Sequence, residues 1–186
     1  SVAILSAIPH LPSSIKVVSR CANSHPKGFQ TAIVGKERLS ALIALAPGQV
    51  DSLVKLAGVS RDRVVLIPNG VDLSRFSSIQ RQSIDEARPI RLGFLGRIEH
   101  VQKGVLYLPK VLHAAIGRGA NFTLKVAGRG KHLDDFKRQI AKLGLESQVD
   151  FLGQLPRSDV PKFLAETDLL LFPSQFEGCP NSLLEG

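Results

Sequence analysis

The feature that most constrains the fold is a regular alternation of short apolar segments and helical segments in the second half of the chain. Four apolar runs have the length and composition of buried strands, namely residues 90–95, 122–127, 149–152 and 169–172. The segments between them carry apolar residues at helical spacing, at 104–117, 131–143 and 158–165. Such alternation predicts an α/β domain with a parallel sheet that helices cover on both faces.

The first half of the chain shows a less regular pattern. Residues 14–20 and 64–67 are β-branched and bounded by turn residues, which predicts two strands. Residues 36–46 predict a helix, because the apolar positions recur at steps of three and four, and 49–57 predict a second helix after a Pro-Gly break.

The periodicity disappears between the two halves. Residues 77–89 are rich in Ser, Gln, Arg, Asp and Glu, which is typical of an interdomain linker. The predicted organisation is therefore a first domain at 1–76, a linker at 77–89 and a second domain at 90–186.

Composition limits the function classes. The chain has 186 residues, 44% of them hydrophobic, which is enough for a core, and no apolar run approaches the roughly 20 residues of a membrane span. Cys21 and Cys179 are too few for a disulfide framework, so a reducing cytoplasm is expected. The five histidines share no spacing, so no bound metal is expected. The net charge of +8 suits phosphorylated substrates or anionic lipid, whereas one Tyr and no Trp argue against a nucleic-acid partner.

The last stretch of the chain predicts a binding site. It consists of a strand, a Pro/Ser/Gly turn and a helix that begins near Asn181, with Glu177 and Glu185 bracketing the turn. The first N–H groups of a helix and its dipole attract anions. Carboxylates are good acceptors for sugar hydroxyls, so an anion seat between two of them suits a sugar nucleotide.

A second candidate region follows the first strand of the second domain, where the sequence places Arg97 and Lys103. In parallel sheets, ligands bind beyond the carboxyl ends of the strands. Two cations of different geometry suit a diphosphate, although a solvated loop with two ordinary cations is the simpler alternative.

Gly128-Arg129-Gly130 is more typical of a tight turn than of a dinucleotide site. The turn at Leu155 could frame a nucleobase edge or be a plain turn.

Taken together, these motifs resemble the C-terminal domain of retaining GT-B glycosyltransferases, and most closely glycosyltransferase family 4 (group 1). The motifs that carry the resemblance are Gly96-Arg97 with Lys103-Gly104, Phe151-Leu152-Gly153, Pro173-Ser174 with Glu177-Gly178, and Leu183-Leu184-Glu185. Ile67–Asp72 with Arg75-Phe76 is similar to the family's interdomain crossover. The resemblance implies two incomplete Rossmann-like domains of GT-B type: the end of the acceptor-side domain and the first part of the donor-binding domain.

The resemblance also implies residue roles. Arg97 and Lys103 would hold the donor diphosphate and neutralise the leaving phosphate, and Glu177 would orient the donor sugar. Glu185 would bind the ribose hydroxyls. The remaining donor-binding positions implied in this way are Gly96, Leu155, Asn181, Ser182 and Leu183.

The implied activity is transfer of a hexose from a nucleoside-diphosphate sugar to a saccharide or lipid-linked acceptor. Anomeric configuration would be retained, without a metal or cofactor. A cytoplasmic protein with peripheral contact at the inner membrane face is expected, and the 186 residues alone are expected to transfer no sugar. The alternatives are a GT-B-like sugar-nucleotide epimerase and a non-catalytic module that binds nucleotide sugars or anionic surfaces. Pro180 departs from the family pattern, because it removes one backbone donor from the phosphate seat.

Overall fold

The structure, a computed structural model, describes residues 5, 7–77, 79, 80 and 87–186. The chain divides into two compact units, one made of Ser1–Gly70 with Phe176–Asn181 and the other of Val71–Gln175 with Ser182–Gly186. Much of the predicted linker, at 78 and 81–86, lies outside the described residues. The predicted domain limits stay a prediction.

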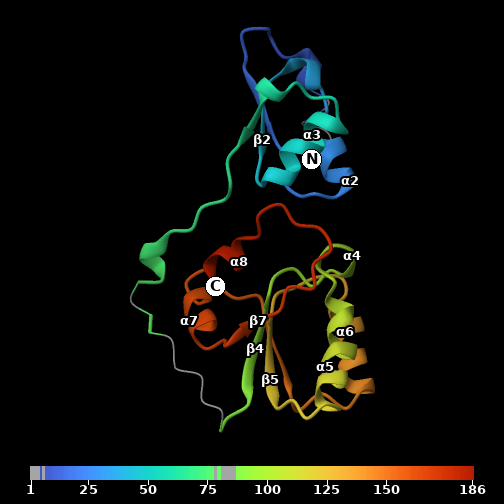
Figure 1. The fold of residues 1–186 in the computed structure, drawn as a ribbon, viewed down its shortest axis with the longest axis vertical. Coiled ribbons are helices and arrows are strands. Elements are labelled where there is room, and N and C mark those ends of the chain that lie inside the picture. Colours follow the sequence, from blue (N-terminus) through green and yellow to red (C-terminus); the bar gives the residue numbers. More distant parts are fainter. Residues whose placement is uncertain (1–4, 6, 78, 81–86) are drawn as a thin grey trace. The chain divides into compact units, whose positions relative to one another are not determined.

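The first unit contains a three-stranded parallel sheet in the order β1-β2-β3 (Figure 1). Its strands are β1 (Val17–Arg20), β2 (Leu39–Ala44) and β3 (Val64–Leu66). Its helices are α2 (Pro26–Ala32) and α3 (Pro47–Lys55), with short 3-10 turns η1 (Ile8–His10), η2 (Lys36–Arg38) and η3 (Arg61–Arg63). Buried side chains of the strands and helices, including Leu42, Leu53 and Val64, form its core.

The predicted helix at 36–46 is wrong, because this segment forms η2 and then the central strand β2. The cause lies in the position of β2 between two parallel neighbours, where most of its side chains are covered. Leu39, Leu42 and Ala44 are all buried. A strand covered in this way is a nearly continuous apolar run, and such a run satisfies a helical template as well as a strand template.

Pro47, interpreted from the sequence as a breaker, lies in the first turn of α3. Proline is favoured there because its missing N–H would have no partner in the helix and its φ is already helical. As a result, α3 begins two residues earlier than predicted.

The second unit contains a four-stranded parallel sheet in the order β6-β5-β4-β7, which confirms the predicted α/β fold class. Its strands are β4 (Ile90–Leu95), β5 (Phe122–Ala127), β6 (Val149–Gly153) and β7 (Leu169–Leu170). Its helices are α4 (His100–Lys103), α5 (Leu108–Ile116), α6 (Leu133–Lys142), α7 (Val160–Ala165) and α8 (Asn181–Glu185), the last shared with the first unit, with 3-10 turns η4 (Leu73–Arg75) and η5 (Val105–Tyr107).

The core of the second unit lies between the sheet and the helices α5 and α6. Phe136 of α6 is fully buried, and its ring packs edge-on against Phe151 of β6 with 5.3 Å between centroids. On β4, a Cβ at Gly93 would lie 2.8 Å from Thr167 Cγ2, so only glycine lets the segment after α7 approach this strand. Helix α7, predicted at 158–165, begins two residues later at Val160, and Asp159 occupies its N-cap position.

An ion-pair cluster joins the amino ends of β4 and β7. The Asp168 side chain is 4% exposed and accepts hydrogen bonds from Arg88 at 2.6 Å and from Arg91 at 2.8 Å. It also accepts from the backbone N–H of Arg91 at 2.8 Å. The guanidinium groups of Arg88 and then Arg91 hold the pKa of Asp168 far below its usual range.

This cluster predicts an acid-dependent loss of stability. Asp168 should stabilise the fold fully above its unfolded pKa of about 3.9, and this stabilisation should be lost progressively as the pH falls from that value towards the much lower pKa of the folded state. Asp168→Asn should lower the free energy of unfolding by about 2 kcal/mol at pH 7, through lost charged hydrogen bonds. The difference between wild type and variant should shrink towards pH 3.

Urea unfolding of both proteins at several pH values measures this difference. The control is Asp150→Asn, a change at an exposed position of β6. An effect of Asp168→Asn no larger than that of the control would contradict the prediction.

Candidate functional site

The loop after β4 carries the two predicted cations and is fixed to its neighbours by backbone contacts. Gly96 N–H donates to Ala127 O at 3.0 Å, and Ile98 N–H donates to Arg129 O at 2.8 Å. A Cβ at Gly128 would lie 1.8 Å from Gly96 O, and one at Gly130 would lie 2.1 Å from Ile98 O. The two glycines of the Gly-x-Gly motif therefore let the turn after β5 lie in direct backbone contact with the loop after β4. This agrees with the tight-turn interpretation.

Helix α4 holds the segment between the two cations in one conformation. Glu99 is its N-cap, and its carboxylate accepts from Val101 N–H at 3.0 Å and Gln102 N–H at 2.8 Å. Burial opposes ionisation of Glu99, but these two backbone donors, together with Lys131, lower its pKa. The negative charge of the Glu99 cap also interacts favourably with the positive, N-terminal end of the helix dipole.

The two predicted cations lie at opposite ends of this segment. Arg97 is exposed, and its Nη2 donates to Gln102 Oε1 at 3.1 Å. Lys103 is half-buried at the last position of α4, and Gly104 follows with a φ of 64° that favours glycine. Position and capping therefore give both cations a defined place after the carboxyl end of β4.

The loop after β7 is attached to the same corner of the second unit. A Cβ at Gly104 would lie 2.0 Å from Pro173 O, so the two backbones are in direct contact. Gln175 N–H donates to Gln102 O at 2.8 Å, and Gln175 Nε2 donates to the Tyr107 hydroxyl at 2.7 Å. Because β4 and β7 are neighbours in the sheet, the loops at their carboxyl ends lie side by side.

Helix α8 begins at Asn181, as predicted, and ends at Glu185. The Glu185 side chain is 14% exposed and forms an ion pair of 3.4 Å with Arg75 Nη1. Arg75 also donates to the carbonyl oxygen of Arg157. Sequence reasoning missed Arg75: it stood in the crossover motif without a role, and no local spacing relates it to a carboxylate 110 positions away.

The other predicted donor-binding residues of the second unit differ in how far they are buried and in what they contact. Leu155 is half-buried and packs against a small cluster that contains Val160 and Phe163. Ser182 is half-buried and Leu183 is 57% exposed. Glu185 also lines a hollow of 180 Å³ whose walls include Phe76, Ile79, Pro161, Leu164 and Ala165.

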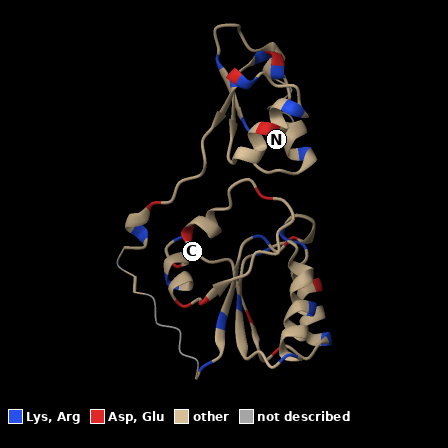
Figure 2. Cartoon of the chain, viewed as in Figure 1, with Lys and Arg blue, Asp and Glu red and all other residues tan. Residues whose placement is uncertain are grey.

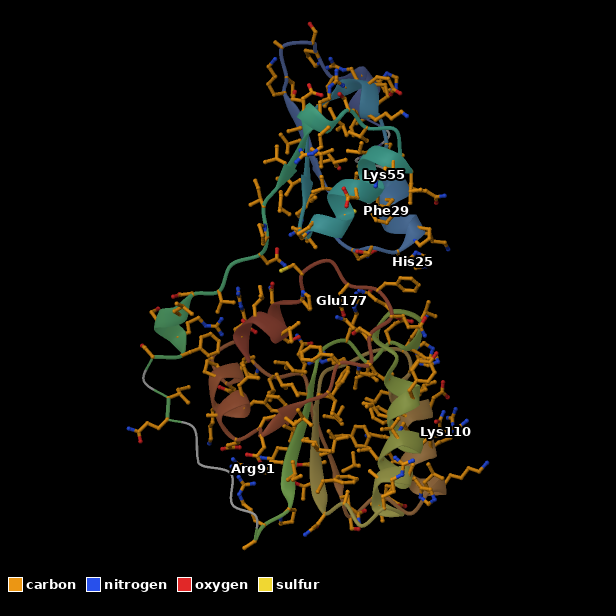
Figure 3. The ribbon with its side chains drawn as sticks, viewed as in Figure 1. His25, Phe29, Lys55, Arg91, Lys110 and Glu177 are labelled. Atoms are coloured by element: carbon orange, nitrogen blue, oxygen red, sulfur yellow. The ribbon has the colours of Figure 1, made fainter. Side chains whose placement is uncertain are left out.

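Glu177 belongs to the first unit and is half-buried. Figure 3 labels its side chain on the segment between β7 and α8. Its carbonyl oxygen accepts from Ser24 Oγ at 2.7 Å, and the adjacent Phe176 ring packs edge-on against His25 with 4.8 Å between centroids. Asn69 Nδ2 donates to Cys179 O at 2.6 Å and to Asn181 Oδ1 at 2.9 Å. The predicted convergence of Glu177 with Arg97 and Lys103 stays a prediction, because the residues belong to different units.

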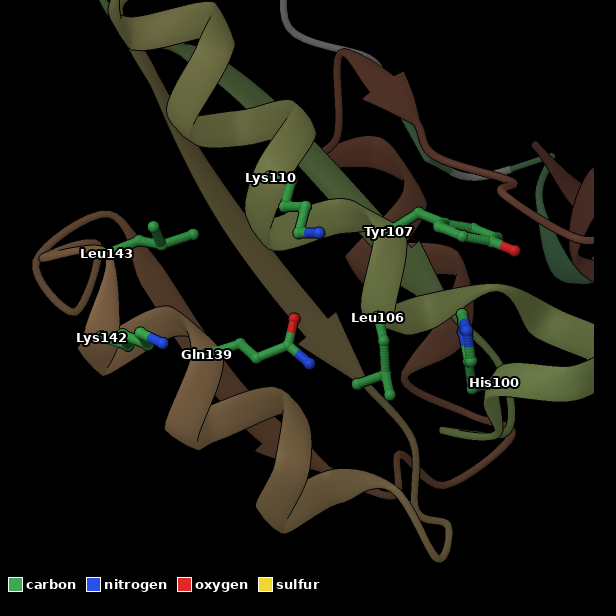
Figure 4. A pocket seen from close by; sticks show the side chains of 7 residues that line it. All are labelled: His100, Leu106, Tyr107, Lys110, Gln139, Lys142 and Leu143. Carbon is green, nitrogen blue, oxygen red and sulfur yellow. The ribbon is translucent and has the colours of Figure 1, made fainter.

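A separate groove of 580 Å³ lies between α5 and α6 of the second unit (Figure 4). Its lining is mixed, with two lysine side chains beside apolar and aromatic ones: His100, Leu106, Tyr107, Lys110, Gln139, Lys142 and Leu143. The groove reaches α4 through His100, but none of the residues that line it is a predicted donor-site residue.

Charges of both signs are distributed over each unit (Figure 2). Among the described residues, no three His, Cys, Asp or Glu side chains are grouped in a way that could hold a metal ion. None of the described helices is both long and apolar enough to span a membrane.

The protein-family model described as Glycosyl transferases group 1 matches residues 76–186. The EpsF protein of Bacillus subtilis is 28% identical over 187 residues, which covers 89% of this chain and 48% of that protein. The 2-deoxystreptamine glucosyltransferase of Streptomyces kanamyceticus is 29% identical over 175 residues, which covers 92% of this chain and 43% of that protein. The chain thus spans about half the length of the curated relatives it matches.

The fold is also similar to that of solved glycosyltransferase structures. A TarM mutant from S. aureus, crystallised with Fondaparinux, alpha-GlcNAc-glycerol and UDP, superimposes with a TM-score of 0.75 at 18% identity. The match covers 91% of this chain and 34% of the TarM chain. This likeness confirms the GT-B type of α/β fold.

The contact between Gly104 and Pro173 predicts a large effect of one added methyl group. Gly104→Ala should lower the free energy of unfolding by more than the roughly 1–2 kcal/mol that a left-handed φ costs a non-glycine residue, because the new Cβ would also collide with Pro173 O. Thermal and urea unfolding measure the loss.

The matched control is Gly119→Ala. Gly119 has a φ of 84°, and a Cβ there would have no atom within 4 Å. Gly119→Ala should therefore lower the free energy of unfolding only by the conformational cost of the left-handed φ. Equal losses of unfolding free energy for the two variants would contradict the proposed collision.

Proposed function

The chain belongs to the glycosyl transferases group 1 family, and on this basis we propose that it supplies the donor site of an enzyme that transfers a hexose from a nucleoside-diphosphate sugar. The acceptor is a saccharide or a lipid-linked acceptor. One observation supports the proposal above the others: the capped Arg97–Lys103 segment and the loop after β7 are joined at the carboxyl edge of the second sheet. This is the edge at which open parallel sheets bind their ligands.

The chemistry asks for positive charge at the leaving group. As the bond from the sugar to the diphosphate breaks, negative charge develops on the phosphate and the sugar becomes oxocarbenium-like. Preorganised cations stabilise this charge more in the transition state than in the ground state. Arg97 supplies a planar fork for one phosphate and Lys103 a point charge for the other. Glu99 fixes the spacing between them through its cap on α4.

The remaining roles follow the family resemblance. Glu185 binds the ribose hydroxyls, and its ion pair with Arg75 holds the carboxylate in place for that purpose. Backbone groups of Asn181, Ser182 and Leu183 approach the distal phosphate. Gly96 borders the diphosphate, and the turn at Leu155 contacts the nucleobase.

The proposed enzyme is a metal-independent glycosyltransferase of family 4 in which Glu177 orients the donor sugar and the anomeric configuration is retained. Transfer takes place in the cytoplasm, with peripheral contact at the inner membrane face. UDP is the first nucleotide to test, because TarM, a structural neighbour, was crystallised with UDP and a GlcNAc-glycerol.

Isothermal titration of the chain with UDP, GDP and ADP tests the donor site. One of the three should bind, and Arg97→Ala or Lys103→Ala should weaken it by about tenfold or more, since a charged hydrogen bond contributes about 1.5–3 kcal/mol. Glu185→Gln should weaken it less, because the amide still accepts from a hydroxyl.

The control is Arg118→Ala. Arg118 is exposed and follows α5, before the amino end of β5, so it lies away from the carboxyl edge. Equal losses for Arg118→Ala and Arg97→Ala would indicate a generic basic surface instead of a diphosphate site.

A further inference from the structure

A buried polar side chain of the first unit lies directly beneath the Glu177 segment. Gln49 of α3 is 1% exposed, one of only two buried polar or charged residues among those the structure describes. A buried amide costs free energy unless its hydrogen bonds are satisfied, so its partners indicate what it is for.

The partners of Gln49 connect two strand ends. Its Oε1 accepts from Leu45 N–H at 2.7 Å, just after β2, and its Nε2 lies 3.5 Å from Ser24 Oγ in the loop after β1. The Leu45 donor fixes the amide oxygen on that side, so the NH₂ group faces Ser24. The amide therefore bridges the carboxyl ends of β1 and β2.

The hydroxyl of Ser24 carries this bridge on to the segment 176–181. Ser24 Oγ accepts from the Gln49 amide and donates its own hydrogen to Glu177 O at 2.7 Å. The next residue, Gly178, has no room for a side chain: a Cβ there would lie 2.7 Å from Ala22 O and 3.1 Å from Gln49 Nε2. The backbone at Glu177 is thus held against the same two strand ends by a hydrogen bond and by close packing.

From these contacts we propose that Gln49 and Ser24 are positioning residues for the Glu177 carboxylate. They act on its main chain: Gln49 orients the Ser24 hydroxyl, and the hydroxyl fixes the Glu177 carbonyl, which sets the direction in which the side chain leaves the backbone. The inference rests on the proposed function, in which Glu177 orients the donor sugar. It adds that residues at the carboxyl ends of β1 and β2 determine how well that carboxylate meets the sugar.

The variant that tests this is Ser24→Ala. It should weaken binding of the matching sugar nucleotide about 5- to 10-fold, in keeping with the loss of one hydrogen bond. It should leave the affinity for the corresponding nucleoside diphosphate within twofold, because that ligand lacks the sugar. Titration calorimetry with both ligands provides the comparison. A merely structural role of Ser24 would lower both affinities together, and that result would overturn the proposal.

Ser52→Ala is the matched control. Its hydroxyl donates to Gly48 O within α3, at 2.9 Å, and the same atom is removed from the same unit. It should change neither affinity, and a loss equal to that of Ser24→Ala would overturn the proposal.

A double-mutant cycle with Glu177→Ala separates a path through Glu177 from an independent effect. If Ser24 acts through this carboxylate, Ser24→Ala should have no further effect on sugar-nucleotide affinity once the carboxylate is gone. Additive losses would overturn the proposal.

Amide hydrogen exchange keeps the positioning inference distinct from the proposed function. Ser24→Ala should accelerate exchange in 176–181, whereas Ser52→Ala should not. If the wild-type chain bound no sugar nucleotide, the proposed function would fail. Faster exchange would then still support the positioning contact, and unchanged exchange would overturn it.

Discussion

The contact between the Gly104 backbone and the Pro173 carbonyl is the constraint on which the candidate site of the second unit depends. It brings the turn after α4 against the loop after β7, and the hydrogen bonds of Gln175 to Gln102 and Tyr107 maintain that approach. Glu99 fixes α4 from the other side through its cap. Arg97 and Lys103 therefore project from a segment whose two ends are both restrained, and such restraint is what electrostatic preorganisation requires.

The predicted carboxylates divide between the two units. Glu185 lies at the end of α8 and is paired with Arg75, whereas Glu177 lies in a segment that clusters with the first unit. Seven residues separate the two acids in the sequence, yet each has its own structural support. Ser24 and Asn69 hold the segment around Glu177, and both precede it by more than a hundred positions.

Much of the second unit could be predicted from sequence because its signals are local. The strands β4, β5 and β6, the helix α6 and the start of α8 at Asn181 all follow from apolar spacing and turn residues. The first unit was harder to predict. The sequence of strand β2 predicts a helix instead, because coverage by its neighbours makes its apolar run continuous. Arg75 and Gln49 gave no signal, since their partners are set by tertiary packing and not by spacing along the chain.

The ion pairs of Asp168 with Arg88 and Arg91 join the amino ends of β4 and β7, whereas the loops proposed to meet the donor follow the carboxyl ends of the same strands. In a sheet built in this way, stability and substrate preference depend on residues at opposite ends of the strands and can be engineered separately. Thermostability could be improved by substitutions around the arginine cluster, one strand length away from the residues proposed to recognise the nucleotide. Substrate preference could likewise be changed by substitutions in the loops at the carboxyl ends of β4 and β7, without breaking the ion pairs of Asp168 that join the amino ends of these strands.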